Sequence, residues 1–97
     1  GGELGISTAA YLHFVASTPH ITQPCASIYH QQTDDIIEGG PMKLQDGFMR
    51  VPEAPGLGVK LDEDKVRIYA ELYEKVGLYR WYGDVRRTGW TPTMPMW

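Results

Sequence analysis

Several features that mark common classes of protein are scarce or missing in this chain of 97 residues. Its single cysteine, Cys25, cannot form an internal disulfide, which argues against a disulfide-stapled secreted fold. No apolar run is long enough to span a membrane, and the first residues lack the basic-then-apolar order of a secretion signal. These absences predict a protein of the reducing cytoplasm that makes no membrane contact.

Positive charge is also scarce. Nine Lys and Arg residues stand against twelve Asp and Glu residues, giving a net charge of −3 with no basic run. Because nucleic-acid binding depends on clustered cations that contact phosphates, the composition predicts no nucleic-acid partner. Arg80, Arg86 and Arg87 lie among aromatic residues that could stack on bases, but three arginines in an acidic chain are a weak signal.

One long part of the chain has no charged residues at all. Residues 4–33 contain no Asp, Glu, Lys or Arg. An independent domain needs polar surface around its outer elements, so this uncharged stretch predicts elements that are covered on more than one side. The first third of the chain is therefore predicted to lie inside something larger than these residues. The alternative is a surface built from Ser, Thr, Gln and His.

Two helices are predicted. Residues 6–18 have apolar side chains nearly all round, with Ser7 as a possible N-cap and Pro19 at the end. A helix of this kind usually lies between two layers. Residues 63–76 have one apolar stripe, with Asp62 as N-cap, Gly77 as the residue after the C-cap and a possible Glu63–Arg67 pair.

The remaining segments are shorter or irregular. Residues 21–26 could form a strand, which Pro24 would limit to a position where one amide is unpaired. Residues 27–41 indicate a long loop. Asp46-Gly47 between residues 42–45 and 48–51 is a strong hairpin signal. Residues 78–97 are aromatic without a period, and we expect them to lie across another surface.

Residues 46–62 carry a longer pattern: a hairpin of the form D-G-x-x-x-V-P, then P-G-L-G-V, then an acidic helix start. This pattern resembles the C-terminal signature of the enolase superfamily, in its mandelate racemase and muconate lactonizing branch. Residues 10–19 have the A-x-x-H-x-x-A-x-x-P pattern, similar to the family's helix after the seventh barrel strand. Residues 89–92, Gly-Trp-Thr-Pro, resemble the tail of the glucarate dehydratase-like subgroup.

The resemblance implies an α/β fold, the C-terminal fragment of a (β/α)8 barrel. This fragment would hold the last helices and the eighth strand, followed by a crossover β-hairpin, an amphipathic helix and an irregular aromatic tail. Residues 1–41 would complete the barrel domain, and residues 42–97 would form the crossover hairpin, helix and tail that pack on the capping domain.

The resemblance also implies a chemistry. Members of the superfamily remove the proton next to a carboxylate and hold the resulting enolate on Mg²⁺, and the subgroup likeness points to an acid-sugar dehydratase. The family's metal ligands, lysine bases and catalytic histidine would all precede Gly1. The chain would then hold no catalytic or metal-binding residue and would be inactive alone. Racemisation and cycloisomerisation are supported by the same scaffold.

Three substrate-binding positions follow from the resemblance. Glu3 would face the pocket from the loop that carries the family's histidine. Cys25 would stand at the end of the eighth strand, where many members have Glu or Asp, and a thiol is a much weaker hydrogen-bond donor than a carboxylic acid. Ser27 would stand where glucarate dehydratases have a histidine that contacts substrate. Without the resemblance, Glu3 is a flexible terminal residue and Cys25 a small buried hydrophobe.

Other functions remain open from the residues alone. Cys25 with a histidine could act as a nucleophile, but no local motif supports this. The side chains of His20, His30, Asp34 and Asp35 could ligate a metal, but they lack the tight spacing of known sites. A different class of function is a small interaction module that forms a homo-oligomer through its first helix and aromatic tail. A two-chain enzyme with a larger partner is a third possibility.

Overall fold

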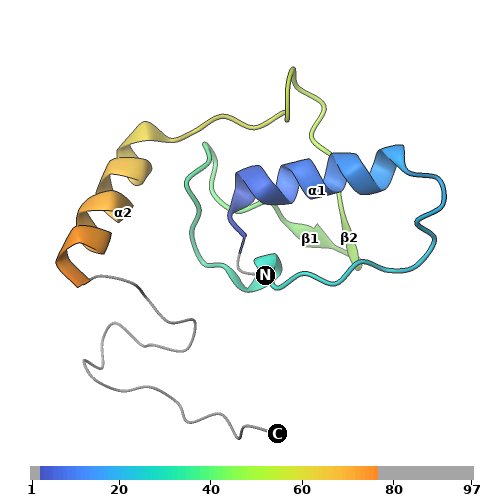
Figure 1. Ribbon diagram of the computed structural model, residues 1–97, viewed down its shortest axis with the longest axis horizontal. Helices are drawn as coiled ribbons and strands as arrows, with labels where there is room; N and C mark the ends of the chain where they lie inside the picture. Colours follow the sequence, from blue (N-terminus) through green and yellow to red (C-terminus); the bar gives the residue numbers. More distant parts are fainter. Residues whose placement is uncertain (1–2, 77–97) are drawn as a thin grey trace, which may run out of the picture.

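The computed structural model describes residues 3–76, which form two α-helices, one turn of 3-10 helix and a two-stranded hairpin (Figure 1). In chain order these are α1 (Gly5–Ser17), η1 (Tyr29–Gln31), β1 (Leu44–Gln45), β2 (Phe48–Met49) and α2 (Glu63–Val76). The predicted α/β class is confirmed. The predicted C-cap region at Gly77 and the aromatic tail lie outside the described residues.

Helix α1 begins one residue earlier than predicted, and Ser7 is not its N-cap. The N-cap residue is Leu4, which has no side-chain oxygen to offer to the first turn. The acceptor comes from elsewhere in the chain: the carboxyl group of Asp35 accepts the Gly5 amide at 3.0 Å. At the other end, the Thr18 hydroxyl donates to the Phe14 carbonyl at 2.7 Å. The start of α1 is therefore capped by a tertiary contact.

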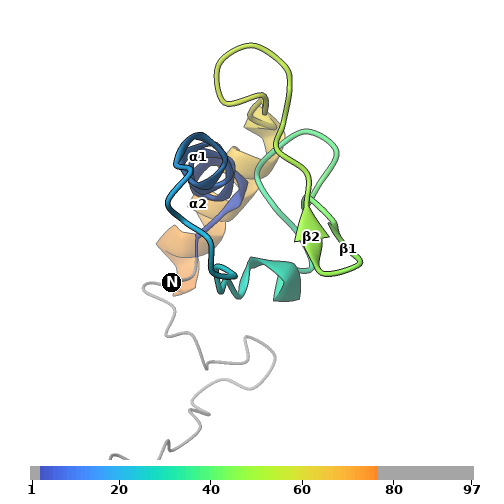
Figure 2. The ribbon, with the colours of Figure 1, turned by 90° about the vertical axis from the view of Figure 1, so that its right-hand side faces the viewer.

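Only the first turns of α1 are buried by the described residues. Gly5, Thr8 and Ala9 are buried, whereas Tyr11 and Phe14 are each 59% exposed. Figure 2, which looks nearly along α1, shows the hairpin and the loop that precedes it on one side of the helix. Residues 3–76 thus leave exposed the apolar side chains that α1 carries on its other sides. The uncharged opening segment led us to expect that this chain would not enclose α1 by itself.

The hairpin forms at Asp46-Gly47 as predicted, although its strands are only two residues long. Leu44 pairs with Met49 and Gln45 pairs with Phe48. The two turn residues both have positive φ, 52° at Asp46 and 82° at Gly47. Positive φ at both central positions is the geometry of a type I′ turn, whose twist matches that of the flanking strands.

The predicted strand at residues 21–26 is not formed. These residues have no regular secondary structure and are mostly exposed. A strand exists only through hydrogen bonds to a neighbouring strand, and within residues 3–76 no segment is paired with this one. Pro24 also removes one of the amides that pairing would use.

The loop that follows is more ordered than predicted. It contains η1, and Ile37 forms a β-bridge with Leu61. Two backbone hydrogen bonds support the bridge: the Glu38 amide donates to the Lys60 carbonyl at 2.9 Å, and the Asp62 amide donates to the Ile36 carbonyl at 2.8 Å. The bridge holds the loop against the residues that lead into α2.

Helix α2 begins at the predicted residue, Glu63, and has the predicted N-cap. The Asp62 carboxyl accepts the Lys65 amide at 3.1 Å. Arg67 pairs with Asp64 at 2.8 Å, so the predicted Glu63–Arg67 pair is wrong by one position. Figure 1 shows α2 to one side of α1 and the hairpin.

The buried side chains of the described residues form one small cluster. It lies where the first turns of α1 meet η1 and the loop, and it consists of Thr8, Ala9, Tyr29, Asp35 and Ile37. Large apolar side chains elsewhere are exposed, including Phe48 at 78% and Ile68 at 56%. No helix among residues 3–76 has the length and apolar character needed to cross a membrane.

Candidate functional site

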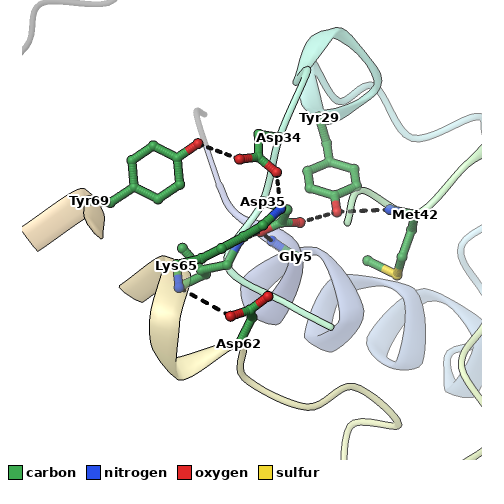
Figure 3. Close-up of polar contacts among 9 residues, drawn as sticks. Gly5, Tyr29, Asp34, Asp35, Met42, Asp62, Lys65 and Tyr69 are labelled. Carbon is green, nitrogen blue, oxygen red and sulfur yellow. Dashed lines mark hydrogen bonds and ion pairs between the residues drawn. The ribbon is translucent and has the colours of Figure 1, made fainter. Parts of the chain in front are cut away.

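Asp35 is the central residue of the buried cluster. Its side chain is 1% exposed, and one carboxyl oxygen accepts the amides of Gly5 at 3.0 Å and Ile36 at 2.7 Å. The second carboxyl oxygen accepts the Tyr29 hydroxyl (Figure 3). A buried carboxyl group is costly unless donors surround it, and Asp35 has three. This group therefore joins α1, η1 and the loop at a single point.

Tyr29 extends the same contact toward the hairpin. Its side chain is fully buried, and its hydroxyl donates to Asp35 while it accepts the Met42 amide at 3.1 Å. Burial raises the pKa of Tyr29 to about 12, and the hydrogen bond to Asp35 adds to the rise. The neutral hydroxyl is the form that fits this site.

This raised pKa gives a prediction for high pH. Because the pKa of Tyr29 lies above the ordinary value of 10.0, its contribution to stability is complete below pH 10 and is lost as the pH rises toward 12. Carbon-13 NMR of the complete enzyme with ring-labelled tyrosine should show a resonance that titrates near pH 12 and disappears in Tyr29→Phe. If that resonance titrates with the exposed tyrosines, the buried hydroxyl does not have the environment described.

Asp34 is turned the other way, toward α2. Its carboxylate accepts the Lys65 ammonium and the Tyr69 hydroxyl, the latter at 2.6 Å. The hydrogen bond from Lys65 lowers the pKa of Asp34 to about 2, with the Tyr69 bond as the second cause. Figure 3 shows the two neighbouring aspartates directed to different helices. The Asp34–Asp35 pair thus connects the loop to both α1 and α2.

Two of the three predicted substrate-binding residues, Ser27 and Glu3, lie next to the hydrogen bonds of Tyr29 and Asp35. The Ser27 hydroxyl oxygen accepts the Tyr29 amide at 3.1 Å. Glu3 is two residues before Gly5, and a hydrogen bond from its own backbone lowers the pKa of its carboxyl group. Ser27 and Glu3 are therefore linked through Tyr29, Asp35 and Gly5.

The third predicted residue, Cys25, is not part of this link. It is exposed, and its thiol contacts the Gln23 carbonyl at 3.8 Å. The alternative interpretation of Cys25 as a buried hydrophobe is therefore wrong for the described residues.

Sequence reasoning missed Tyr29 and gave Asp35 only as part of a long loop or as a possible metal ligand. The one available signal was at the start of α1, where the N-cap residue Leu4 has no side-chain acceptor and the first turn has no acidic residue. A helix start without a local cap needs an acceptor from elsewhere, and Asp is a favoured capping residue.

The metal interpretation of the loop has no support from the geometry. Both aspartates are occupied by donors from the protein, and residues 3–76 contain no group of three or more His, Cys, Asp or Glu side chains that could hold a metal ion. The described residues therefore do not fit a Mg²⁺ site, and no step through Mg²⁺ can be derived from them.

Comparison with known proteins supplies the family. The profile of the enolase C-terminal domain-like family matches residues 1–65. A probable glucarate dehydratase of Streptomyces coelicolor is 33% identical over 98% of this chain. A chloromuconate cycloisomerase of Pseudomonas putida is 36% identical over 67% of it. The chain spans 23% and 18% of the lengths of these two proteins.

Solved structures that resemble this chain point to the same family. An isomerase from Streptomyces coelicolor is 53% identical and superposes with a TM-score of 0.74 over 79% of this chain and 20% of its own. An enolase from Mycobacterium smegmatis, solved with formate and acetate, is 37% identical with a TM-score of 0.74 over 80% of this chain and 18% of its own. The chain therefore belongs to the enolase C-terminal domain-like family, in the mandelate racemase and muconate lactonizing branch of the enolase superfamily.

Proposed function

We propose that this chain is the C-terminal segment of a Mg²⁺-dependent acid-sugar dehydratase, which removes the proton next to a carboxylate and passes through an enolate. The observation that carries the proposal is the extent of the relationship to the probable glucarate dehydratase, which covers 98% of the chain. The relationship to the cycloisomerase covers 67%. Enzymes of the superfamily act on carboxylate substrates, which fits removal of a proton next to a carboxylate.

In this proposal the described residues bind substrate and do not perform the proton transfer. Ser27 uses one lone pair to accept the Tyr29 amide, which leaves its hydroxyl proton able to donate to a substrate oxygen. The lowered pKa of Glu3 favours the carboxylate form, which can accept a hydrogen bond from a sugar hydroxyl. Cys25 would be a weak hydrogen-bond donor to the same substrate. The metal ligands and catalytic bases would come from the rest of the enzyme.

The exposed apolar surface supports a segment that works only within a larger protein. Residues 1–41 would belong to the barrel, whose strands would cover Tyr11 and Phe14 and pair with residues 21–26. Residues 42–97 would pack on the capping domain, where the exposed Phe48 and Ile68 would find apolar contacts. We therefore expect the isolated chain to have no activity.

One observation favours a second candidate reaction. The solved structure that is 53% identical to this chain is described as an isomerase. An isomerase can begin with the same proton abstraction and return the proton to the opposite face of the enolate, whereas a dehydratase expels a hydroxyl group. The substrate-binding roles of Glu3 and Ser27 are the same in both cases, so the products must distinguish them.

The test is an assay of the complete enzyme encoded by the reading frame that contains this chain. With Mg²⁺ and a panel of aldonic and aldaric acids, we expect a 2-keto product from at least one acid and no product from the isolated chain. An epimerised acid without water loss would favour the isomerase. Product from the isolated chain would contradict the expected inactivity, and a stable oligomer of the chain that binds no acid would favour the interaction module.

A further inference from the structure

The contacts of Tyr29 suggest a role beyond packing. Its amide donates to the Ser27 hydroxyl at 3.1 Å, and its own hydroxyl donates to Asp35. Asp35 in turn accepts the amide of Gly5 at 3.0 Å, two residues after Glu3. The hydrogen bonds that lead from Ser27 to Gly5, two residues after Glu3, therefore run through one tyrosine and one aspartate, which are 0% and 1% exposed.

The geometry around this link leaves little freedom. A Cβ atom on Gly5 would lie 2.4 Å from an Asp35 carboxyl oxygen and 2.7 Å from the Ile37 side chain. The Tyr29 hydroxyl is also fixed from the other side, because it accepts the Met42 amide at 3.1 Å. Buried hydrogen bonds with close packing on every side hold groups in one arrangement better than exposed contacts do.

We propose that Tyr29 and Asp35 are positioning residues that set the distance between Glu3 and Ser27 in the substrate site. This role rests on the proposed function, since it gives Glu3 and Ser27 a common ligand, the hydroxylated carboxylate substrate. Neither positioning residue touches the substrate. Each acts through a neighbour: the Tyr29 amide donates a hydrogen bond to the Ser27 hydroxyl, and the Asp35 carboxyl group accepts one from the Gly5 amide at the start of α1.

The proposal has a kinetic consequence that a purely structural role lacks. Glu3 and Ser27 would contact substrate groups in the same way before and during the reaction. Disturbing their spacing therefore raises KM and leaves kcat nearly unchanged. A loss of folded protein alone would instead lower the apparent kcat at constant KM.

The test compares Tyr29→Phe with Tyr73→Phe in the complete enzyme. Tyr73 is on α2 and 58% exposed, so its variant makes the same chemical change away from the link. For Tyr29→Phe we expect a KM about tenfold higher, which corresponds to about 1.4 kcal/mol, with kcat within about twofold. Tyr73→Phe should change neither value. Hydrogen exchange should increase in peptides that cover residues 3–8 and 27–36.

The possible outcomes separate this role from the proposed function. An active enzyme in which Tyr29→Phe keeps the original KM, or loses only kcat, overturns the positioning role and leaves the dehydratase proposal intact. A well-folded unmodified enzyme that turns over none of the acids overturns both. As a second variant, Asp35→Asn keeps an oxygen for the Gly5 amide. Because it replaces the oxygen that accepts the Tyr29 hydroxyl, it should also raise KM and leave kcat nearly unchanged.

Discussion

Replacing Asp35 by alanine is expected to lower the free energy of unfolding of the complete enzyme by about 3–4 kcal/mol. The substitution removes the acceptor for the Gly5 and Ile36 amides and for the Tyr29 hydroxyl. All three donors lie in or beside the buried cluster, where water cannot replace the lost carboxyl group. The measurement is equilibrium unfolding in urea.

The adjacent residue provides a matched control. Asp34 has the same side chain, but that side chain is 40% exposed and pairs with Lys65 on the surface of α2. Surface ion pairs contribute little because water screens them, so Asp34→Ala should destabilise the protein far less than Asp35→Ala. Equal losses for the two variants would show that Asp35 is not the central contact.

The Gly5→Ala variant is expected to lose about 2–3 kcal/mol, through overpacking and the weakened hydrogen bond to Asp35. Alanine normally stabilises a helix relative to glycine, so the intrinsic preference predicts the opposite sign. The added Cβ would lie 2.4 Å from an Asp35 oxygen, which places the conflict inside the buried cluster and not at a flexible surface. The helix start and the loop would have to move apart.

Ser7→Ala is the control for this variant. Ser7 is an exposed residue in the first turns of the same helix, and its side chain does not cap α1. We expect the Ser7→Ala variant to change the free energy of unfolding by no more than about 0.5 kcal/mol. If Gly5→Ala were as stable as the unmodified protein, the close approach of Asp35 to the helix would be wrong.

Local signals predicted the elements whose causes are local. Asp46-Gly47 placed the hairpin turn, and Asp62 placed the first residue of α2, because each acts on amides within three residues of itself. The cap of α1 could not be predicted in this way. Ser7 was the nearest candidate, but the acceptor is thirty residues further along the chain, and no local pattern specifies that distance.

The predicted strand at residues 21–26 also depends on partners that a local pattern does not specify. Residues 21–26 have a suitable composition, but a strand needs partners, and within residues 3–76 none is paired with it. The same reasoning applies to the site. The resemblance indicated Glu3 and Ser27, whereas Tyr29 and Asp35 act through contacts that exist only after folding. The uncharged segment led us to expect that this chain would not enclose α1 by itself, and Tyr11 and Phe14 are indeed exposed.

Calorimetry of the isolated chain tests the central claim most directly, namely that its apolar faces are completed by the rest of an enolase-superfamily enzyme. With a buried cluster of five side chains among the described residues, we expect a broad thermal transition with little cooperative heat, or self-association. A single sharp transition of a monomer, with the heat expected for a chain of this length, would show that these residues fold as a self-sufficient domain and would contradict the account.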